Sequence, residues 1–254
     1  MDILEYKKKT DNYQQRHPWE ITRAKIIYHL LKKNENHFKH LLDAGSGDAY
    51  VLNQLYLKNV AEKYTALDTA YDQEIIEKLA SEDQHNIFFL KTLPPKLDPP
   101  ADGVLLLDVI EHCENDSSIL QQINDPAIAQ NFTLLITAPA FQSVFSKHDE
   151  LLLHYRRYSI KKLKQLCESN GLKTEQAGYF FFSLLLIRYL QLFLEKLGLR
   201  KPDHSIDNWK GGKWITSFYT SLLWIDFKIG RLFYKTGIRL PGLSAYCICH
   251  RLPS

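Results

Sequence analysis

The sequence is poor in cysteine and carries no strong excess of charge of either sign. Its four cysteines are too few and too scattered for a disulfide scaffold, so reduced thiols are the simpler interpretation. The net charge of +3 is too small to indicate nucleic-acid binding, and no basic tail or internal repeat is present. With 45% hydrophobic and 24% charged residues, the 254-residue chain is expected to form one main globular domain.

Two kinds of segment are also missing: a secretory signal and an uninterrupted membrane-spanning stretch. Residues 1–10 include three consecutive lysines, but no apolar segment follows them, so we expect a cytoplasmic protein. The most apolar stretch, residues 179–199, contains Arg188 near its middle. A cation at that depth would cost a few kcal/mol in a bilayer, which disfavours a membrane span.

The clearest motif is a glycine-rich turn, Asp43-Ala44-Gly45-Ser46-Gly47, between a predicted strand and a predicted helix. Gly45 and Gly47 have no Cβ, so the backbone can turn tightly and approach a ligand beside the unpaired N–H groups of the helix. Asp68 ends the next apolar run, where nucleotide-binding folds place a carboxylate against ribose hydroxyls. The turn and Asp68 together predict half of a cofactor pocket.

Apolar runs and helical patterns alternate along the chain. The predicted strands are residues 38–42, 63–68, 86–90, 103–107, 132–137, 172–177 and 243–250. The predicted helices between and before them are residues 18–33, 50–58, 72–80, 117–123 and 160–167. This alternation indicates an α/β fold with a mostly parallel sheet and helices on both of its faces.

Polar side chains follow two of the predicted buried strands. Asp108-Val109-Ile110-Glu111-His112 comes directly after the strand at 103–107, and the loop at 138–159 follows the strand at 132–137. That loop is rich in histidine, arginine and tyrosine. Because open α/β sheets bind ligands at the carboxyl ends of their strands, both segments are predicted to line the site.

The segment Cys247-Ile248-Cys249-His250 has two possible interpretations. Thiolates and imidazole are metal ligands, but alternation places both thiols on one face of a predicted strand. We favour the plain strand, and we predict no metal site from the sequence.

Two strongly apolar helices are predicted before the last strand, at residues 179–199 and 214–234. They could bury each other as a cap, form a homodimer, or hold the protein at the inner face of a membrane beside a lipid-like ligand. We favour the peripheral membrane role slightly over the plain cap.

Over most of its length, the chain resembles the class I S-adenosylmethionine-dependent methyltransferases, in particular the bacterial enzymes that act on small molecules and lipids. The segments that carry the resemblance are Asp43 to Gly47, Asp68, Asp108 to His112, Arg16-His17-Pro18-Trp19-Glu20, His148-Asp149 and His154 to Ser159. The resemblance implies a Rossmann-like, seven-stranded sheet in the order 3-2-1-4-5-7-6, with the last strand antiparallel.

The same resemblance implies S-adenosylmethionine as the cofactor. The residues that it implies for cofactor binding are Asp43, Gly45, Ser46, Gly47, Asp68, Thr69, Asp108 and Val109. Two positions depart from the family pattern. Ala49 stands where the family has a third glycine, and Lys91 and Thr92 occupy the region after the third strand where many members have an aspartate.

The implied reaction is methyl transfer to a small-molecule or lipid-like acceptor, with O-methylation favoured. His148 and His112 are the candidate bases because imidazole titrates near neutral pH, although each could instead be a loop histidine bonded to backbone. Tyr155, Arg156 and Arg157 are the candidate acceptor-binding residues, since guanidinium groups match anionic ligands; a solvated surface pair is the alternative.

Two other functions remain open at this point. The chain could be a non-catalytic methyltransferase-like binding or scaffold protein, or a dinucleotide-dependent oxidoreductase, although the latter would usually have glycine where Tyr50 stands. In either case we expect a single domain. Its parts are an arm and helix (1–36), a cofactor-binding core (37–178), an apolar helical insertion (179–240) and a final strand (241–254).

Overall fold

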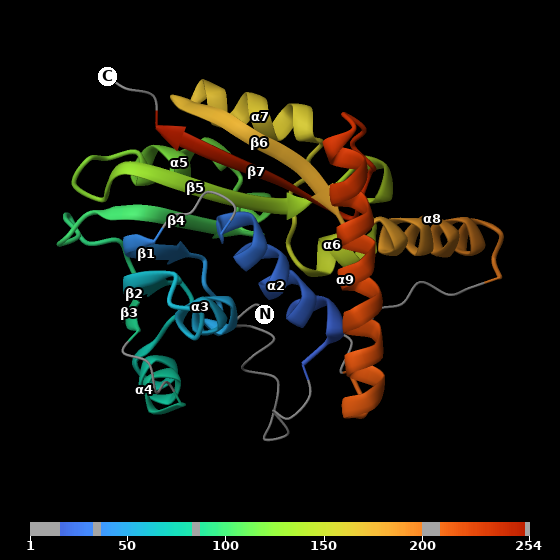
Figure 1. Ribbon diagram of the computed structural model, residues 1–254, viewed down its shortest axis with the longest axis horizontal. Helices are drawn as coiled ribbons and strands as arrows, with labels where there is room; N and C mark the ends of the chain where they lie inside the picture. Colours follow the sequence, from blue (N-terminus) through green and yellow to red (C-terminus); the bar gives the residue numbers. More distant parts are fainter. Residues whose placement is uncertain (1–15, 33–36, 83–86, 200–208, 252–254) are drawn as a thin grey trace.

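The computed structural model describes residues 16–32, 37–82, 87–199 and 209–251. A seven-stranded sheet forms its centre, with the strand order β3-β2-β1-β4-β5-β7-β6 (Figure 1). The strands are β1 (Phe38–Ala44), β2 (Ala61–Leu67), β3 (Phe88–Leu90), β4 (Ala101–Leu107), β5 (Ala129–Pro139), β6 (Leu172–Phe180) and β7 (Ser244–Arg251). This order and the antiparallel pairing of β7 confirm the fold expected from the sequence.

Helices cover both faces of the sheet, as the alternation predicted (Figure 1). One face packs against α2 (Pro18–Lys32), α3 (Tyr50–Tyr56), α4 (Gln73–Glu82) and α9 (Lys213–Lys235). The other face packs against α5 (Asp116–Ile123) and α7 (Ile160–Ser169). The central strands are therefore covered on both sides, and β1 and β4 are buried along almost their whole length.

The apolar helices α8 (Phe182–Lys196) and α9 lie between β6 and β7 in the chain. The first helix begins later than predicted, because Tyr179 and Phe180 pair with β7 and so belong to strand β6. In Figure 1, α9 crosses the end of the sheet next to α2, and α8 projects outward beyond it. In the part of the chain that the structure describes, no helix has the length and apolar character needed to span a membrane.

The strand interpretation of Cys247 and Cys249 is confirmed. Both residues lie in β7, both are buried, and their Cα positions pair with Ile136 and Leu134 of β5. The two thiols pack in the same apolar cluster as Cys167 of α7. They are therefore core residues of the sheet.

Candidate functional site

A cleft of about 930 Å³ opens at the carboxyl edge of the sheet. Its walls come from the loops after β1, β2 and β4, from the loop between β5 and α7, and from the inner side of α8. The loops after β5 include two short helices, η2 (Gln142–Val144) and α6 (Lys147–Leu151). A space of this size is large enough for a nucleotide-sized ligand together with a second small molecule.

The glycine turn forms one wall of the cleft. Gly45 has φ +85°, and a Cβ at this position would lie 2.3 Å from Val109 Cγ2, so the backbone packs directly against the loop after β4. Gly47 also has a positive φ, of 56°. Ala49 has φ 54° although it carries a Cβ, and it is fully buried at the start of α3. Ala49 thus adopts the left-handed conformation that a glycine would favour.

Asp68 holds the turn from the adjacent strand. Its Oδ2 accepts the N–H of Gly47 at 3.0 Å, and its Oδ1 accepts the N–H of Ala70 at 2.9 Å. Tyr71, which is fully buried, completes this arrangement by donating its hydroxyl to the carbonyl of Gly47 at 2.7 Å. These bonds fix the shape of the turn while the edge of Asp68 still lines the cleft.

Two further carboxylates lie at the ends of β1 and β4. Asp43 is buried, its Oδ1 has no hydrogen-bond partner among the described residues, and burial raises its pKa to about 7. Asp108 is ion-paired with Arg23 of α2, with 2.8 Å between Oδ2 and Nη1, and it accepts the hydroxyl of Thr137 at 2.8 Å. The ion pair between Arg23 and Asp108 thereby holds helix α2 beside the cleft.

The segment that precedes α2 docks on the glycine turn. Arg16 Nη2 lies 2.6 Å from Asp48 Oδ2, and the Arg16 guanidinium stacks over the Tyr50 ring. Trp19 lines the cleft.

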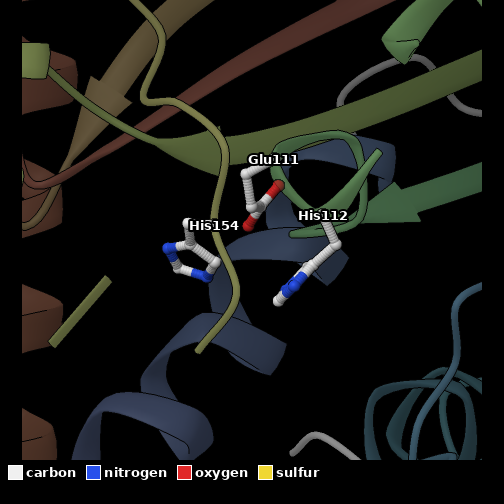
Figure 2. A group of neighbouring side chains, drawn as sticks. All are labelled: Glu111, His112 and His154. Atoms are coloured by element: carbon white, nitrogen blue, oxygen red, sulfur yellow. The ribbon is translucent and has the colours of Figure 1, made fainter. Parts of the chain in front are cut away.

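The opposite wall of the cleft carries three residues that converge, Glu111, His112 and His154. Their nearest ligand atoms all lie within 4.8 Å of one another (Figure 2). Glu111 is fully buried, and burial raises its pKa well above the usual range. The His112 and His154 rings meet edge to face, with 4.6 Å between centroids.

His154 is oriented by a buried ion pair. Its Nδ1 lies 3.0 Å from Asp149 Oδ1, and Arg157 Nε donates to the same oxygen at 2.7 Å. Asp149 also accepts the N–H of Ser146 at 2.9 Å, as the cap of α6. The bonds from His154 and Arg157 outweigh burial and lower the pKa of Asp149 to about 2, so it is ionised at neutral pH.

His148 lines the same cleft from α6. Partial burial lowers its pKa below the usual value, and Arg188 and Arg157 lower it further, while Asp149 opposes them. The neutral ring therefore predominates near neutral pH and can accept a proton.

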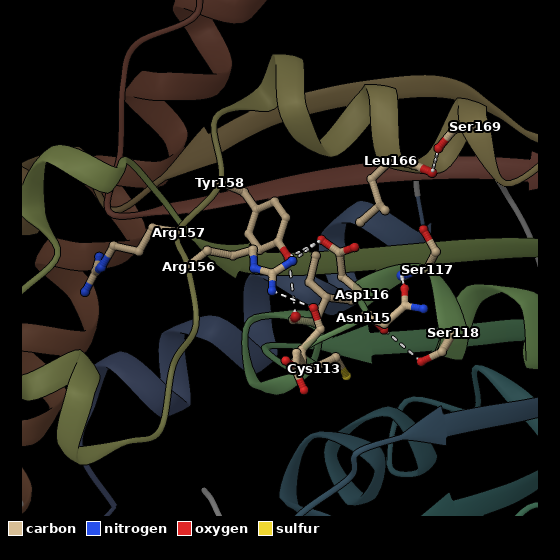
Figure 3. Close-up of polar contacts among 12 residues, drawn as sticks. Cys113, Asn115, Asp116, Ser117, Ser118, Arg156, Arg157, Tyr158, Leu166 and Ser169 are labelled. Carbon is tan, nitrogen blue, oxygen red and sulfur yellow. Dashed lines mark hydrogen bonds and ion pairs between the residues drawn. The ribbon is translucent and has the colours of Figure 1, made fainter.

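The predicted acceptor-binding residues divide into two groups. Arg157 lines the cleft, whereas Tyr155 and Arg156 are absent from the cleft lining within the described residues. Arg156 Nη1 instead lies 3.2 Å from Asp116 Oδ2, and its Nη2 donates to the Glu114 carbonyl at 2.6 Å. In Figure 3 the two arginine side chains extend in opposite directions.

Asp116 also anchors Tyr158, whose hydroxyl donates to Asp116 Oδ2 at 2.8 Å. Arg156 and Tyr158 therefore both contact Asp116 at the start of α5 (Figure 3). These contacts position the segment from His154 to Ser159.

Several cleft residues were not singled out from the sequence as site residues. They are Arg23, Asp149, His154 and Arg188. Tyr71, which supports the glycine turn from outside the cleft lining, was also missed. Asp149 and His154 stand in the polar loop that the sequence marked, so only their roles were missed. Arg188 was read as an obstacle to membrane insertion, but it lines the cleft and donates to the hydroxyl of Ser146.

No family model matches the chain, and no curated protein matches its sequence. Solved structures do share its fold. The [4+2]-cyclase SpnF matches with a TM-score of 0.57 and 12% identity, over 97% of this chain and 86% of that chain. The plantazolicin methyltransferase BpumL in complex with SAH matches with a TM-score of 0.55 and 14% identity, over 93% and 85%.

The YcgJ protein from Bacillus subtilis matches with a TM-score of 0.53 and 14% identity, over 89% of this chain and 97% of that chain. At these identities the likeness establishes the fold. The chain therefore has the Rossmann-like fold of class I S-adenosylmethionine-dependent methyltransferases.

Proposed function

We propose that this protein is an S-adenosylmethionine-dependent methyltransferase that methylates an oxygen of a small-molecule or lipid-like acceptor. The observation that carries the proposal is the cradle at Gly45, where a Cβ would collide with Val109. The cradle lies beside Asp68 and beside Oδ1 of Asp43, which has no hydrogen-bond partner in the described part of the chain. Bare backbone flanked by carboxylates fits the polar methionine and ribose parts of this cofactor.

All eight residues implied for cofactor binding line the cleft, namely Asp43, Gly45, Ser46, Gly47, Asp68, Thr69, Asp108 and Val109. When bound, the cofactor supplies an activated methyl group on a sulfonium. Methyl transfer is an in-line displacement, so the task of the protein is to align the acceptor oxygen and to exclude water. The cleft lies between the sheet edge and α8, which suits both tasks.

His148 is the residue that would take the acceptor proton. Its lowered pKa leaves a neutral ring nitrogen near neutral pH, and it lines the cleft together with Arg157 and Arg188. The two guanidinium groups favour an acceptor that carries negative charge. We assign His148 as the proton acceptor and Arg157 and Arg188 as the groups that attract the acceptor.

The fold is shared by a protein described as a [4+2]-cyclase, so fold alone does not decide between methyl transfer and another use of the site. Isothermal titration calorimetry with S-adenosylmethionine and with S-adenosylhomocysteine tests the cofactor directly. We expect both to bind, and we expect Asp68→Asn to weaken both at least tenfold. The control is Glu62→Ala, on the strand β2 that leads to Asp68 but exposed and outside the cleft lining.

Two outcomes would contradict the assignment. Absence of binding at high micromolar ligand would favour a scaffold protein, and preferred binding of a nicotinamide dinucleotide would favour an oxidoreductase. If Asp68→Asn binds as well as the wild type, the cofactor does not lie against Asp68.

The lipid-like acceptor is supported by the outer surface of α8 and α9, which we call the apolar helix pair. Its exposed apolar residues are Leu186, Ile187, Tyr189, Leu190, Phe193, Trp214, Ile215, Phe218, Tyr219, Leu222, Ile225, Ile229, Leu232 and Phe233. Basic residues accompany them at Lys196, Lys213, Lys228, Arg231 and Lys235. Apolar and basic side chains together suit the surface of an anionic membrane.

The same helix α8 contributes Leu184 and Arg188 to the cleft, so the helix that carries part of the exposed apolar surface also borders the proposed site. Co-sedimentation with phosphatidylglycerol vesicles measures the attachment of the helix pair to an anionic membrane. We expect Leu190→Ser/Phe193→Ser to lose binding and Phe88→Ser, which removes an equally exposed ring from β3, to retain it. A homodimer in solution that leaves vesicles unbound would show that the helix pair covers a second copy instead.

A further inference from the structure

Glu111, His112 and His154 form a cluster that the proposed function does not yet use. Glu111 and His112 lie in the short helix η1 (Ile110–His112) after β4, and His154 lies between α6 and α7. All three line the cleft, and their side chains point toward one another (Figure 2). Two imidazoles and one carboxylate are a common set of ligands for a catalytic metal ion.

Glu111 gives the cluster an unsatisfied acceptor. The side chain is 0% exposed, and neither Oε1 nor Oε2 has a hydrogen-bond partner within the described ranges. Buried carboxylate oxygens are normally hydrogen-bonded, paired with a cation or bound to a metal. A cation between Glu111 and the two histidines would satisfy both oxygens.

His154 has the support that metal-binding histidines usually have. Its Nδ1 lies 3.0 Å from Asp149 Oδ1, and Asp149 is fixed in turn by Arg157 and by the N–H of Ser146. With Nδ1 protonated against this carboxylate, the lone pair of Nε2 is available on the other side of the ring. A carboxylate behind a histidine fixes the tautomer and orients the ring toward a metal.

We propose that Glu111, His112 and His154 bind a divalent transition-metal ion whose remaining positions face the cleft and hold the acceptor oxygen. Adjacent ligand atoms at a bound ion lie roughly 3 Å apart. The distances between the ligand atoms of the cluster, which are up to 4.8 Å, must therefore shorten by about an ångström or two when an ion binds. His112 is the exposed member and is the one that can turn inward.

The ion deepens the proposed function by explaining how an unactivated hydroxyl becomes a nucleophile. Bound to the metal, the acceptor O–H loses its proton more readily, and that proton passes to a ring nitrogen of His148. The oxygen then forms a bond to the methyl carbon as the carbon–sulfur bond breaks. The bonding pair stays on sulfur, so a neutral thioether and a methylated oxygen result.

Calorimetry and visible absorption on the full chain, stripped with EDTA and titrated with Co²⁺ and then Mn²⁺, test the site without measuring activity. We expect one ion per chain, with absorption in the visible range for Co²⁺. His112→Ala, at an exposed position that folding tolerates, and Glu111→Gln are each expected to weaken binding at least tenfold. Asp149→Asn is expected to weaken it about tenfold through His154.

His148→Ala is the matched control, because it removes a histidine from the same cleft but not from the cluster, and it is expected to keep full metal affinity. Equal binding by wild type and by Glu111→Gln/His112→Ala would overturn the proposal. The inference rests on the proposed function, and the two can fail separately. Binding of S-adenosylhomocysteine without Co²⁺ binding overturns only the metal site, whereas Co²⁺ binding without either cofactor form overturns methyl transfer.

Discussion

The two walls of the cleft are built in different ways. The wall proposed to hold the cofactor, here called the cofactor wall, is mainly backbone, shaped by the turn at Gly45 and Gly47 and fixed by Asp68 from the next strand. The wall proposed to hold the acceptor, here called the acceptor wall, is made of side chains, Glu111 after β4 and Asp149 with His154 after β5, which only the folded sheet brings together. One wall depends on the absence of side chains and the other on their exact identity.

This difference determines how each wall should respond to mutation. On the cofactor wall, adding even one carbon is damaging because the space is already filled. On the acceptor wall, removing a charge is damaging because its buried partner is then left unpaired. Four substitutions, in order of decreasing expected effect, test this contrast.

Gly45→Ala should have the largest effect. The new Cβ would lie 2.3 Å from Val109 Cγ2, and φ of +85° would be strained for alanine. Left-handed strain and overpacking together predict a loss of roughly 2–6 kcal/mol in the free energy of unfolding. Urea denaturation measures this loss. A loss below about 1 kcal/mol would mean that the turn moves freely away from the loop after β4.

Asp149→Ala should have the next largest effect, on the acceptor wall. It leaves Arg157, which is buried, without its carboxylate partner and frees the ring of His154. Breaking a buried pair from one side costs about 3–5 kcal/mol. Arg156→Ala is the comparison, because its ion pair with Asp116 is more exposed and the bond from Tyr158 to Asp116 stays intact, and its loss should be about 1 kcal/mol. Equal losses in the two variants would contradict a special role for the buried pair.

The contrast also explains what the sequence could predict. The turn, Asp68 and the alternation of strands and helices follow from contiguous patterns, and a glycine's backbone freedom is a property of the residue itself. The strand order was implied by the family resemblance. All eight residues implied for the cofactor line the cleft, and their role in binding it stays a prediction. The boundary at Tyr179 was missed because aromatic residues suit a strand as well as an apolar helix, and only pairing with β7 decides.

The acceptor wall was harder to predict because its roles arise from contacts between distant segments. Arg156 and Arg157 are neighbours in sequence, yet one binds Asp116 on α5 and the other binds Asp149. Nothing local to the pair distinguishes them. Likewise, His154 differs from His148 through its bond to Asp149, and that bond depends on how the loop folds.

Asp43→Asn should remove a pH dependence from the cofactor wall. Burial raises the pKa of Asp43 to about 7 in the folded protein, from about 4 in an unfolded chain. The folded state therefore keeps a proton that the unfolded state loses, and its stability falls as pH rises from about 4 to about 7. The contribution is roughly 2–4 kcal/mol across this window. Urea denaturation at pH 5, 6 and 8 should show a flatter profile for the variant.

Gly230→Ala, in the apolar helix pair, makes the same chemical change as Gly45→Ala but should have a small effect of opposite sign. Gly230 lies within the helix α9, and a Cβ there would have no atom within 4 Å. Alanine favours a helix interior over glycine by about 0.5–1 kcal/mol, so the free energy of unfolding should rise by about that amount. Vesicle binding should be unchanged, since one methyl group adds little apolar area. A loss of stability instead would place an additional surface, such as a second copy of the chain, against this side of α9.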